Sequence, residues 1–303
     1  VIIIMEREKE AHSLIKQAET KQKPGFFEKL LSSKESRLEE SLSYYEKAAN
    51  IFKLLKKWSD AGDTLVKCAN IQIELQADPA QYFLEASHCY SFIDKEKSIT
   101  NQKNALNIYI NQGRFQLAGK IQKQLAERYE EDLEYLSAAE CFKKAAEYFA
   151  MESMNSKSYE QGCLIKFADI MCSISNNNKC YPDCPNIYEK IAFQYLNVPL
   201  LKSSAKDLFF KAICVHMAYG ELDDAKSKYN LFISEDPTII DTREDQFLKA
   251  SLSAVEEKNV DVFKAACSKY KAYTDFDKFK INVFARIHDN LKPSFEDDQE
   301  GFL

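Results

Sequence analysis

The chain has 303 residues, of which 45% are hydrophobic and 29% are charged, and its formal net charge at pH 7 is −6. A single core stops growing near this length, which favours two domains or a repeat array. Glycine and proline, with seven residues each, are too scarce for a turn-rich β fold. The apolar runs are too short for a membrane span, the VIII at residues 1–4 is too short for a signal peptide, and the acidic balance argues against a nucleic-acid partner.

The first segment with a distinct chemical character is KPGFFEKLLSS, residues 23–33, where Phe26, Phe27, Leu30 and Leu31 lie beside lysines. Two interpretations stay open. The segment could be a helix start packed on a neighbouring helix, or a loop that enters a bilayer surface. Burial of one such side chain is worth about 1.5–3 kcal/mol. Partial insertion would therefore give weak, reversible binding that needs a second anchor.

A period of 19 to 20 residues runs through the first half of the chain. An alanine often precedes each large apolar landmark by four residues, and an aromatic residue often precedes it by seven. These offsets lie on one face of a helix, and alanine lets a second helix approach closely. Two periods make a helical hairpin of roughly 38–40 residues, as in tetratricopeptide-type arrays. The landmarks are Phe52, Ile71, Tyr90, Tyr109, Tyr129 and Phe149.

This pattern predicts an all-α protein. We expect a right-handed α-solenoid of tetratricopeptide-like helical hairpins over residues 5–197, which includes the candidate membrane loop at 23–33. A C-terminal helical bundle is expected over 198–292, followed by an acidic flexible tail over 293–303. The polar stretch 173–186 predicts a long turn before the repeat weakens.

The last third of the chain contains two predicted helix boundaries. Asp236–Pro237 predicts the end of one helix, because proline fits only at the start of the next. Asp241 followed by Glu244 resembles a capping box, which predicts a helix start at this point.

Five basic residues recur at a spacing close to the length of one hairpin repeat. Lys120, Lys166 and Lys206 are 46 and 40 residues apart, and Arg114 and Lys202 lie near the same positions of the repeat. Equivalent positions of successive repeats stack on one face. The spacing therefore predicts a row of cations for an acidic protein partner, although ordinary solvated lysines are the alternative at any single position.

The sequence indicates no catalytic site, cofactor or metal. Nucleotide-binding glycine motifs and metalloprotease motifs are absent from it, and Glu256–Glu257 are adjacent, so they cannot face each other on a helix. Nine cysteines are scattered through apolar patterns, which favours buried free thiols in a reducing compartment. Cys180 and Cys184 lack a second ligand pair, which argues against zinc. The acidic C-terminal region is either a solvated end or a docking surface for a basic partner.

Several stretches resemble the soluble NSF attachment protein family, in the family's order, from about residue 5 to the end. The Phe–Phe segment and the acidic tail resemble the alpha type rather than the gamma type. The matching stretches are YYEKAANIFKLLKKWSDAGDTL (44–65), IYINQGRFQLAGKIQKQLAERYE (108–130), CLIKFADI (163–170), PLLKSSAKDLFFKA (199–212) and EEKNVDVF (256–263).

The resemblance implies a concave basic face that binds the SNARE four-helix bundle, of the syntaxin-containing kind. A further family lysine falls on Gly162, so that contact is lost or replaced here. The matching positions are Arg114, Lys120, Lys166, Lys202 and Lys206. In the helix at 199–212, we expect Phe209 and Phe210, or at least one of them, to pack inward while Lys202 and Lys206 point outward.

The resemblance also implies contacts with membrane and with the hexameric ATPase NSF. The membrane-contacting positions are Phe26, Phe27, Leu30 and Leu31. The NSF-contacting positions are Glu256, Glu257, Phe302 and Leu303, and Ser253 stands where the family has a third acid.

The function implied is a non-enzymatic adaptor that binds SNARE complexes and recruits and stimulates NSF for SNARE disassembly in vesicle trafficking. It would be a monomer alone, act in several copies on one bundle, and be cytoplasmic and peripheral on membranes. The alternative is a general tetratricopeptide-type scaffold that binds extended peptides or chaperones.

Overall fold

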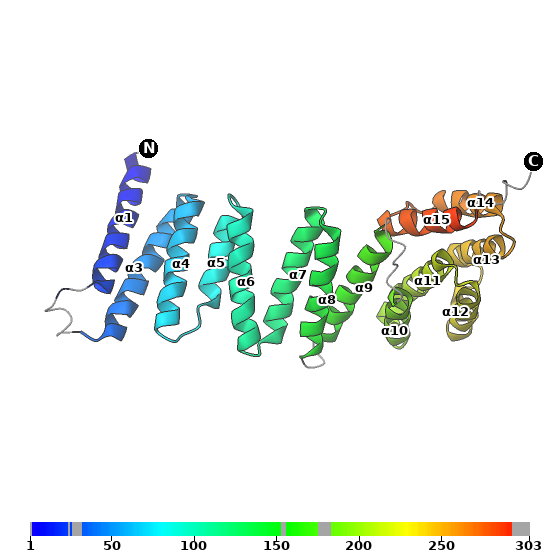
Figure 1. Cartoon of the computed structure of the whole chain (residues 1–303), viewed down its shortest axis with the longest axis horizontal. Helices are drawn as coiled ribbons and strands as arrows, with labels where there is room; N and C mark the ends of the chain where they lie inside the picture. Colours follow the sequence, from blue (N-terminus) through cyan, green and yellow to red (C-terminus); the bar gives the residue numbers. More distant parts are fainter. Residues whose placement is uncertain (1, 24, 26–31, 153–155, 175–182, 293–303) are drawn as a thin grey trace, which may run out of the picture. The chain divides into compact units, whose positions relative to one another are not determined.

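The computed structural model of the chain describes residues 2–23, 25, 32–152, 156–174 and 183–292. No β-strand occurs in these residues, which confirms the predicted all-α class (Figure 1). The helices, in chain order, are α1 (Ile2–Gln22), α3 (Lys34–Leu54), α4 (Trp58–Glu74), α5 (Ala80–Tyr90), α6 (Lys95–Asn111), α7 (Phe115–Glu131), α8 (Tyr135–Ala150), α9 (Lys157–Ser173), α10 (Cys184–Leu196), η2 (Pro199–Leu201), α11 (Lys202–Tyr219), α12 (Leu222–Glu235), η3 (Pro237–Ile239), α13 (Arg243–Glu256), α14 (Val260–Lys271) and α15 (Lys278–Asn290).

The chain forms two compact units. The first contains residues 1–125 with 151–153, and the second contains residues 126–150 with 154–303. Helix α7 begins in the first unit and ends in the second. Helices α8 to α10 share the second unit with the helices of the predicted bundle. The boundary at 197/198 between repeats and bundle therefore stays a prediction.

Helices of the first unit pack in chain order: α1 on α3, α3 on α4, α4 on α5 and α5 on α6 (Figure 1). Packing on nearest neighbours is the defining feature of a helical solenoid. Ala48, Ala61 and Ala86 are fully buried beside Phe52. Because alanine adds little bulk, the helix backbones approach closely there, as the repeat pattern predicted.

Each period of 19 to 20 residues corresponds to one helix and one turn. Phe52, Ile71, Tyr90 and Tyr109 lie in the last turns of α3, α4, α5 and α6, and all four are buried. The alanines that precede the landmarks by four residues have no exposed surface, and they are Ala48, Ala86, Ala105 and Ala145. The periodic residues therefore form the interface between helices.

The turn after α6 fixes the backbone of a predicted site residue. Gly113 adopts a left-handed φ of 69°, and the N–H of Arg114 donates to the carbonyl of Tyr109 at 2.8 Å. This motif satisfies carbonyl groups that the end of a helix leaves free. It also fixes the backbone position from which the Arg114 side chain extends.

The second unit is built around α11, which contacts α10, α12, α13 and α15. All residues from Leu208 to Ala218 are buried, and a helix that is buried on every side needs this cover from several neighbours. Phe209 stacks on Phe232 with ring centroids 4.3 Å apart, and Phe210 lies 5.7 Å from Phe247. The prediction that phenylalanines of this helix pack inward is confirmed for both.

The predicted capping box at the start of α13 is wrong by one residue. Thr242 is the N-cap and accepts a hydrogen bond from the N–H of Asp245 at 3.2 Å. The Asp245 carboxylate in turn accepts from the N–H of Asp241 at 2.9 Å. Asp241 has a left-handed φ of 65°, whereas an N-cap residue adopts the extended region, so Asp241 and Glu244 do not form the box.

Candidate partner-binding surfaces

Two of the predicted SNARE-contacting residues lie in the first unit. Arg114 is exposed, its guanidinium donates to Oδ2 of Asp78 at 2.9 Å, and it lies 4.7 Å from the ring centroid of Tyr109. Lys120 is exposed on α7 and has no ion-pair partner in the described part of the chain. Arg114 is therefore oriented and partly neutralised by its neighbours, whereas Lys120 keeps its full charge in solvent.

The other three lie in the second unit. Lys166 is exposed on α9, and its Nζ lies 3.1 Å from Oε1 of Glu130. Lys202 begins α11 and is exposed. Lys206, one turn later, donates to Oγ1 of Thr238 at 2.8 Å, which links α11 to η3.

A buried acid holds Lys206 in this position. Asp236 is only 6% exposed, and its Oδ2 lies 3.7 Å from the Lys206 ammonium. Burial alone would raise the pKa of Asp236, but hydrogen bonds from Thr238 and the charges of Lys206 and Lys202 lower it below its usual value. Asp236 therefore stays ionised at neutral pH and attracts both lysines of this helix turn.

Lys211 follows Lys202 and Lys206 along α11, but its side chain is buried. Its Nζ lies 3.1 Å from Oδ1 of Asp169, which also accepts a hydrogen bond from the Tyr188 hydroxyl at 2.7 Å. Burial raises the pKa of Asp169 even though Lys211 opposes that shift. Lys211 thus joins α11 to α9 and takes no part in a partner surface.

Sequence reasoning missed Leu200 in η2. This side chain is 93% exposed, and it precedes Lys202 by two residues. No other large hydrophobic side chain in the described residues is as exposed. The signal that could have identified it is Pro199, which follows the end of α10 at Leu196 and begins a short 3-10 helix that contains Leu200.

The predicted acidic contacts lie at the turn between α13 and α14. Glu256 and Glu257 are both exposed. The Glu256 carboxylate contacts the ammonium of Lys226, and Glu257 accepts a hydrogen bond from the Ser253 hydroxyl at 2.8 Å. Ser253 therefore orients a neighbouring acid where the family has a third one.

The remaining predicted contacts lie outside the described residues. They are Phe26, Phe27, Leu30, Leu31, Phe302 and Leu303. No helix in the described ranges is both long enough and apolar enough to cross a bilayer.

One cluster of the second unit has the composition of a metal site. Ligand atoms of His216, Glu221 and Asp224 lie within 4.8 Å of one another. The two ring nitrogens of His216 are already engaged, Nδ1 with Glu221 at 2.7 Å and Nε2 with Glu189 at 3.1 Å. Burial lowers the pKa of His216, but these two carboxylates outweigh it and raise the pKa overall. The cluster therefore favours a protonated imidazole, and we assign it no metal.

Helices packed in chain order in the first unit, with no β-strand in the described residues, define a helical-repeat protein. The model of the family described as "Soluble NSF attachment protein, SNAP" matches residues 9–292. The chain belongs to this family.

Several named proteins are similar to this chain over nearly its whole length. Alpha-soluble NSF attachment protein of Mus musculus is 32% identical over 96% of this chain and 98% of its own length. Beta-soluble NSF attachment protein of Bos taurus is 32% identical over 97% of each chain. Vesicular-fusion protein SEC17 of Komagataella phaffii is 29% identical over 94% of this chain and 96% of its own length.

Proposed function

We propose that this chain is an adaptor that binds SNARE complexes and recruits and stimulates the ATPase NSF for their disassembly. The observation that carries the proposal is the family match over residues 9–292, with relatives named as NSF attachment and vesicular-fusion proteins. NSF supplies the energy in this scheme, and the adaptor supplies the contacts through which force reaches the SNARE bundle.

The SNARE-contacting surface consists of Arg114, Lys120, Lys166, Lys202 and Lys206. Each exposed ion pair contributes only about 0–1 kcal/mol. Affinity then has to come from several such pairs, from several copies on one bundle, and from apolar contacts. Leu200 suits the apolar part, since full burial of a leucine side chain is worth about 1.5–3 kcal/mol.

Two further contacts complete the proposal. Glu256 and Glu257, exposed at the turn between α13 and α14, face NSF, together with Phe302 and Leu303. Phe26, Phe27, Leu30 and Leu31 contact the membrane surface weakly. In this arrangement a chain that is a monomer in solution gains affinity when bundle, membrane and NSF are all present.

A recruitment experiment tests the proposal. Purified SNARE bundle is immobilised, NSF is added with a nucleotide that it cannot hydrolyse, and the NSF retained is measured with and without this chain. NSF should be retained only when the chain is present. The double variant Lys120→Glu, Lys202→Glu should abolish retention, whereas Lys9→Glu, Lys16→Glu, with the same charge change on exposed positions of α1, should not. Retention of NSF without the chain, or equal loss in both variants, would reject the adaptor role.

A further inference from the structure

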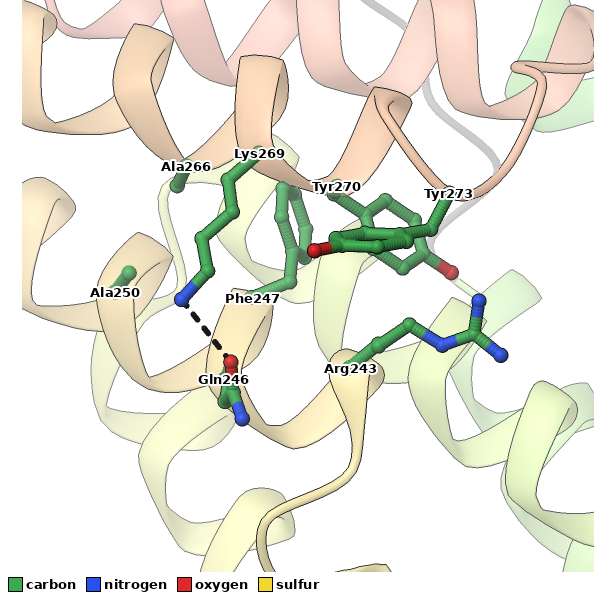
Figure 2. Close-up of a pocket in the computed structure, with 8 residues that line it drawn as sticks. All are labelled: Arg243, Gln246, Phe247, Ala250, Ala266, Lys269, Tyr270 and Tyr273. Carbon is green, nitrogen blue, oxygen red and sulfur yellow. Dashed lines mark hydrogen bonds between the residues drawn. The ribbon is translucent and has the colours of Figure 1, made fainter.

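A small cleft opens between α13 and α14, with a volume of about 80 Å³ (Figure 2). Ala250 on α13 and Ala266 on α14 are among the residues that line it. Two alanines on facing helices leave unfilled space that larger side chains would occupy. The space is sufficient for one side chain of a partner but not for a whole helix.

Positive charge borders this cleft, and no acid is among the residues that line it. Arg243 and Lys269 have no carboxylate partner among the residues that the structure describes. Lys269 donates to Oε1 of Gln246 at 3.1 Å, shown by the dashed line in Figure 2, which leaves two of its three protons for another acceptor. The nearby Glu244 is 3.5 Å from the Tyr270 hydroxyl and does not line the cleft.

Arg243 has an aromatic neighbour in Tyr273 but no carboxylate partner in the described residues. It is the first residue of α13, where the helix dipole presents partial positive charge and a cation is unfavourable. By contrast, Lys249 on the same helix pairs with the carboxylate of Asp245, and Lys226 on α12 pairs with that of Glu256 at the other end of α13. At this helix N-terminus the guanidinium of Arg243 lacks a carboxylate within the described part of the chain, which leaves it available to an acid of a partner.

Aromatic rings form the floor and one wall of the cleft. Phe247 and Tyr270 are buried with ring centroids 4.9 Å apart. Tyr273 is 62% exposed, and the guanidinium carbon of Arg243 lies 5.7 Å from its ring centroid. Figure 2 labels both Tyr270 and Tyr273 among the residues that line the cleft. An apolar side chain between the two cations would contact these rings.

We propose that this cleft binds an acidic segment of a partner protein. One carboxylate pairs with Arg243, another pairs with Lys269, and an aromatic or aliphatic side chain between them contacts Tyr270 and Tyr273. The site is distinct from Glu256 and Glu257, because these acids end the helix that Arg243 begins, about 20 Å away at 1.5 Å per residue. One helix thus presents a cationic cleft at its start and an acidic turn at its end.

A peptide-binding experiment on the full chain tests this inference. The probe is the fluorescent peptide Glu-Asp-Phe-Asp-Glu, and the comparison is Gln-Asn-Phe-Asn-Gln, both measured by anisotropy. The acidic peptide should bind at least tenfold more tightly than its amide counterpart. Arg243→Gln with Lys269→Gln should remove that difference. Lys264→Gln with Lys271→Gln, which changes the charge equally at exposed positions of α14 outside the cleft, should preserve it.

The apolar part of the site has its own test. Tyr273→Ala should weaken binding of the phenylalanine-containing peptide several-fold but should hardly change binding of a version with glycine in place of phenylalanine. The inference is overturned if both double variants lose binding equally, since only bulk charge would then matter. It is also overturned if phosphatidylserine vesicles bind through Arg243 and Lys269 while the acidic peptide does not. Tighter peptide binding after removal of residues 293–303 would overturn the assignment to a partner, because that acidic segment of the chain itself would then be the occupant.

Discussion

The ammonium of Lys206 lies 3.7 Å from Oδ2 of Asp236, so this residue of the proposed SNARE surface is already engaged within the chain. Arg114 with Asp78 and Lys166 with Glu130 show the same relationship. A SNARE carboxylate that pairs with these cations exchanges one ion pair for another and gains little. Lys120 and Lys202, which are exposed and have no ion pair in the described residues, should therefore carry more of the binding free energy.

Release of Lys206 should strengthen binding to the SNARE bundle. Asp236→Asn removes the competing charge but keeps the side-chain oxygen that accepts from the N–H of Thr238 at 3.2 Å. The freed lysine can then form one exposed ion pair with the bundle, which is worth about 0.2–1 kcal/mol, so the dissociation constant should fall up to about fivefold. A titration of labelled bundle measures this effect. Glu6→Gln makes the same charge change at an exposed position of α1 and should leave affinity unaltered.

Gly162 is the position where the resemblance places a further lysine. It is exposed in the interior of α9, one turn before Lys166, and nothing lies within 4 Å of where its Cβ would be. Gly162→Lys should strengthen bundle binding several-fold. Gly162→Gln gives a similar gain in helix propensity without the charge, so only the lysine variant should bind more tightly if this turn faces the bundle. Equal affinity of the two variants would place α9 away from the partner.

Two glycines should respond oppositely to alanine. In Gly62→Ala the new Cβ would lie 2.7–2.9 Å from ring atoms of Tyr90, whose hydroxyl donates to Asp63 at 2.6 Å. This overlap should lower the free energy of unfolding by about 1–3 kcal/mol. In Gly162→Ala the new Cβ has no neighbour within 4 Å, so the substitution should raise the free energy of unfolding by about 0.5–1 kcal/mol. Thermal unfolding followed by circular dichroism measures both shifts, and a stabilised Gly62→Ala variant would contradict the close packing of α4 on α5.

The network around His216 should make part of the stability dependent on pH. Glu189 and Glu221 raise the pKa of His216 against the effect of burial, and Lys228 also contacts Glu189. A raised pKa in the folded state gives stability that is fully present below the unfolded value of about 6.5 and is lost as pH rises through the folded value. His216→Gln should therefore lower the melting temperature more at about pH 6 than at about pH 8.5. A larger effect at the higher pH would contradict the charged state assigned to His216.

The helices were predictable because one physical constraint repeats. Alanine and aromatic residues recur where neighbouring helices touch, as at Ala48 and Phe52, so the period reports both the helix length and the buried face. The start of α13 was less predictable, since Asp241 and Thr242 are both good capping residues and only the backbone conformation distinguishes them.

The candidate site was predictable in its residues but not in their partners. Arg114 and Asp78 are 36 residues apart, as are Lys166 and Glu130, which is close to one helical hairpin. Residues one hairpin apart become neighbours when hairpins stack, so an acid at this distance from each cation was a usable signal. The burial of Lys211 depends on how other helices cover α11, and lysine spacing along one helix carries no information on that cover. The exposure of Leu200 likewise depends on what packs against η2.

The central claim is tested most directly by disassembly of a purified SNARE bundle by NSF and ATP. The rate should be near background without this chain, should rise steeply with its concentration, and should fall again as salt screens the ion pairs. Lys120→Glu with Lys202→Glu should return the rate to background while the melting temperature of the chain stays unchanged. A rate that is independent of the chain, or equal for wild type and this variant, would contradict the account.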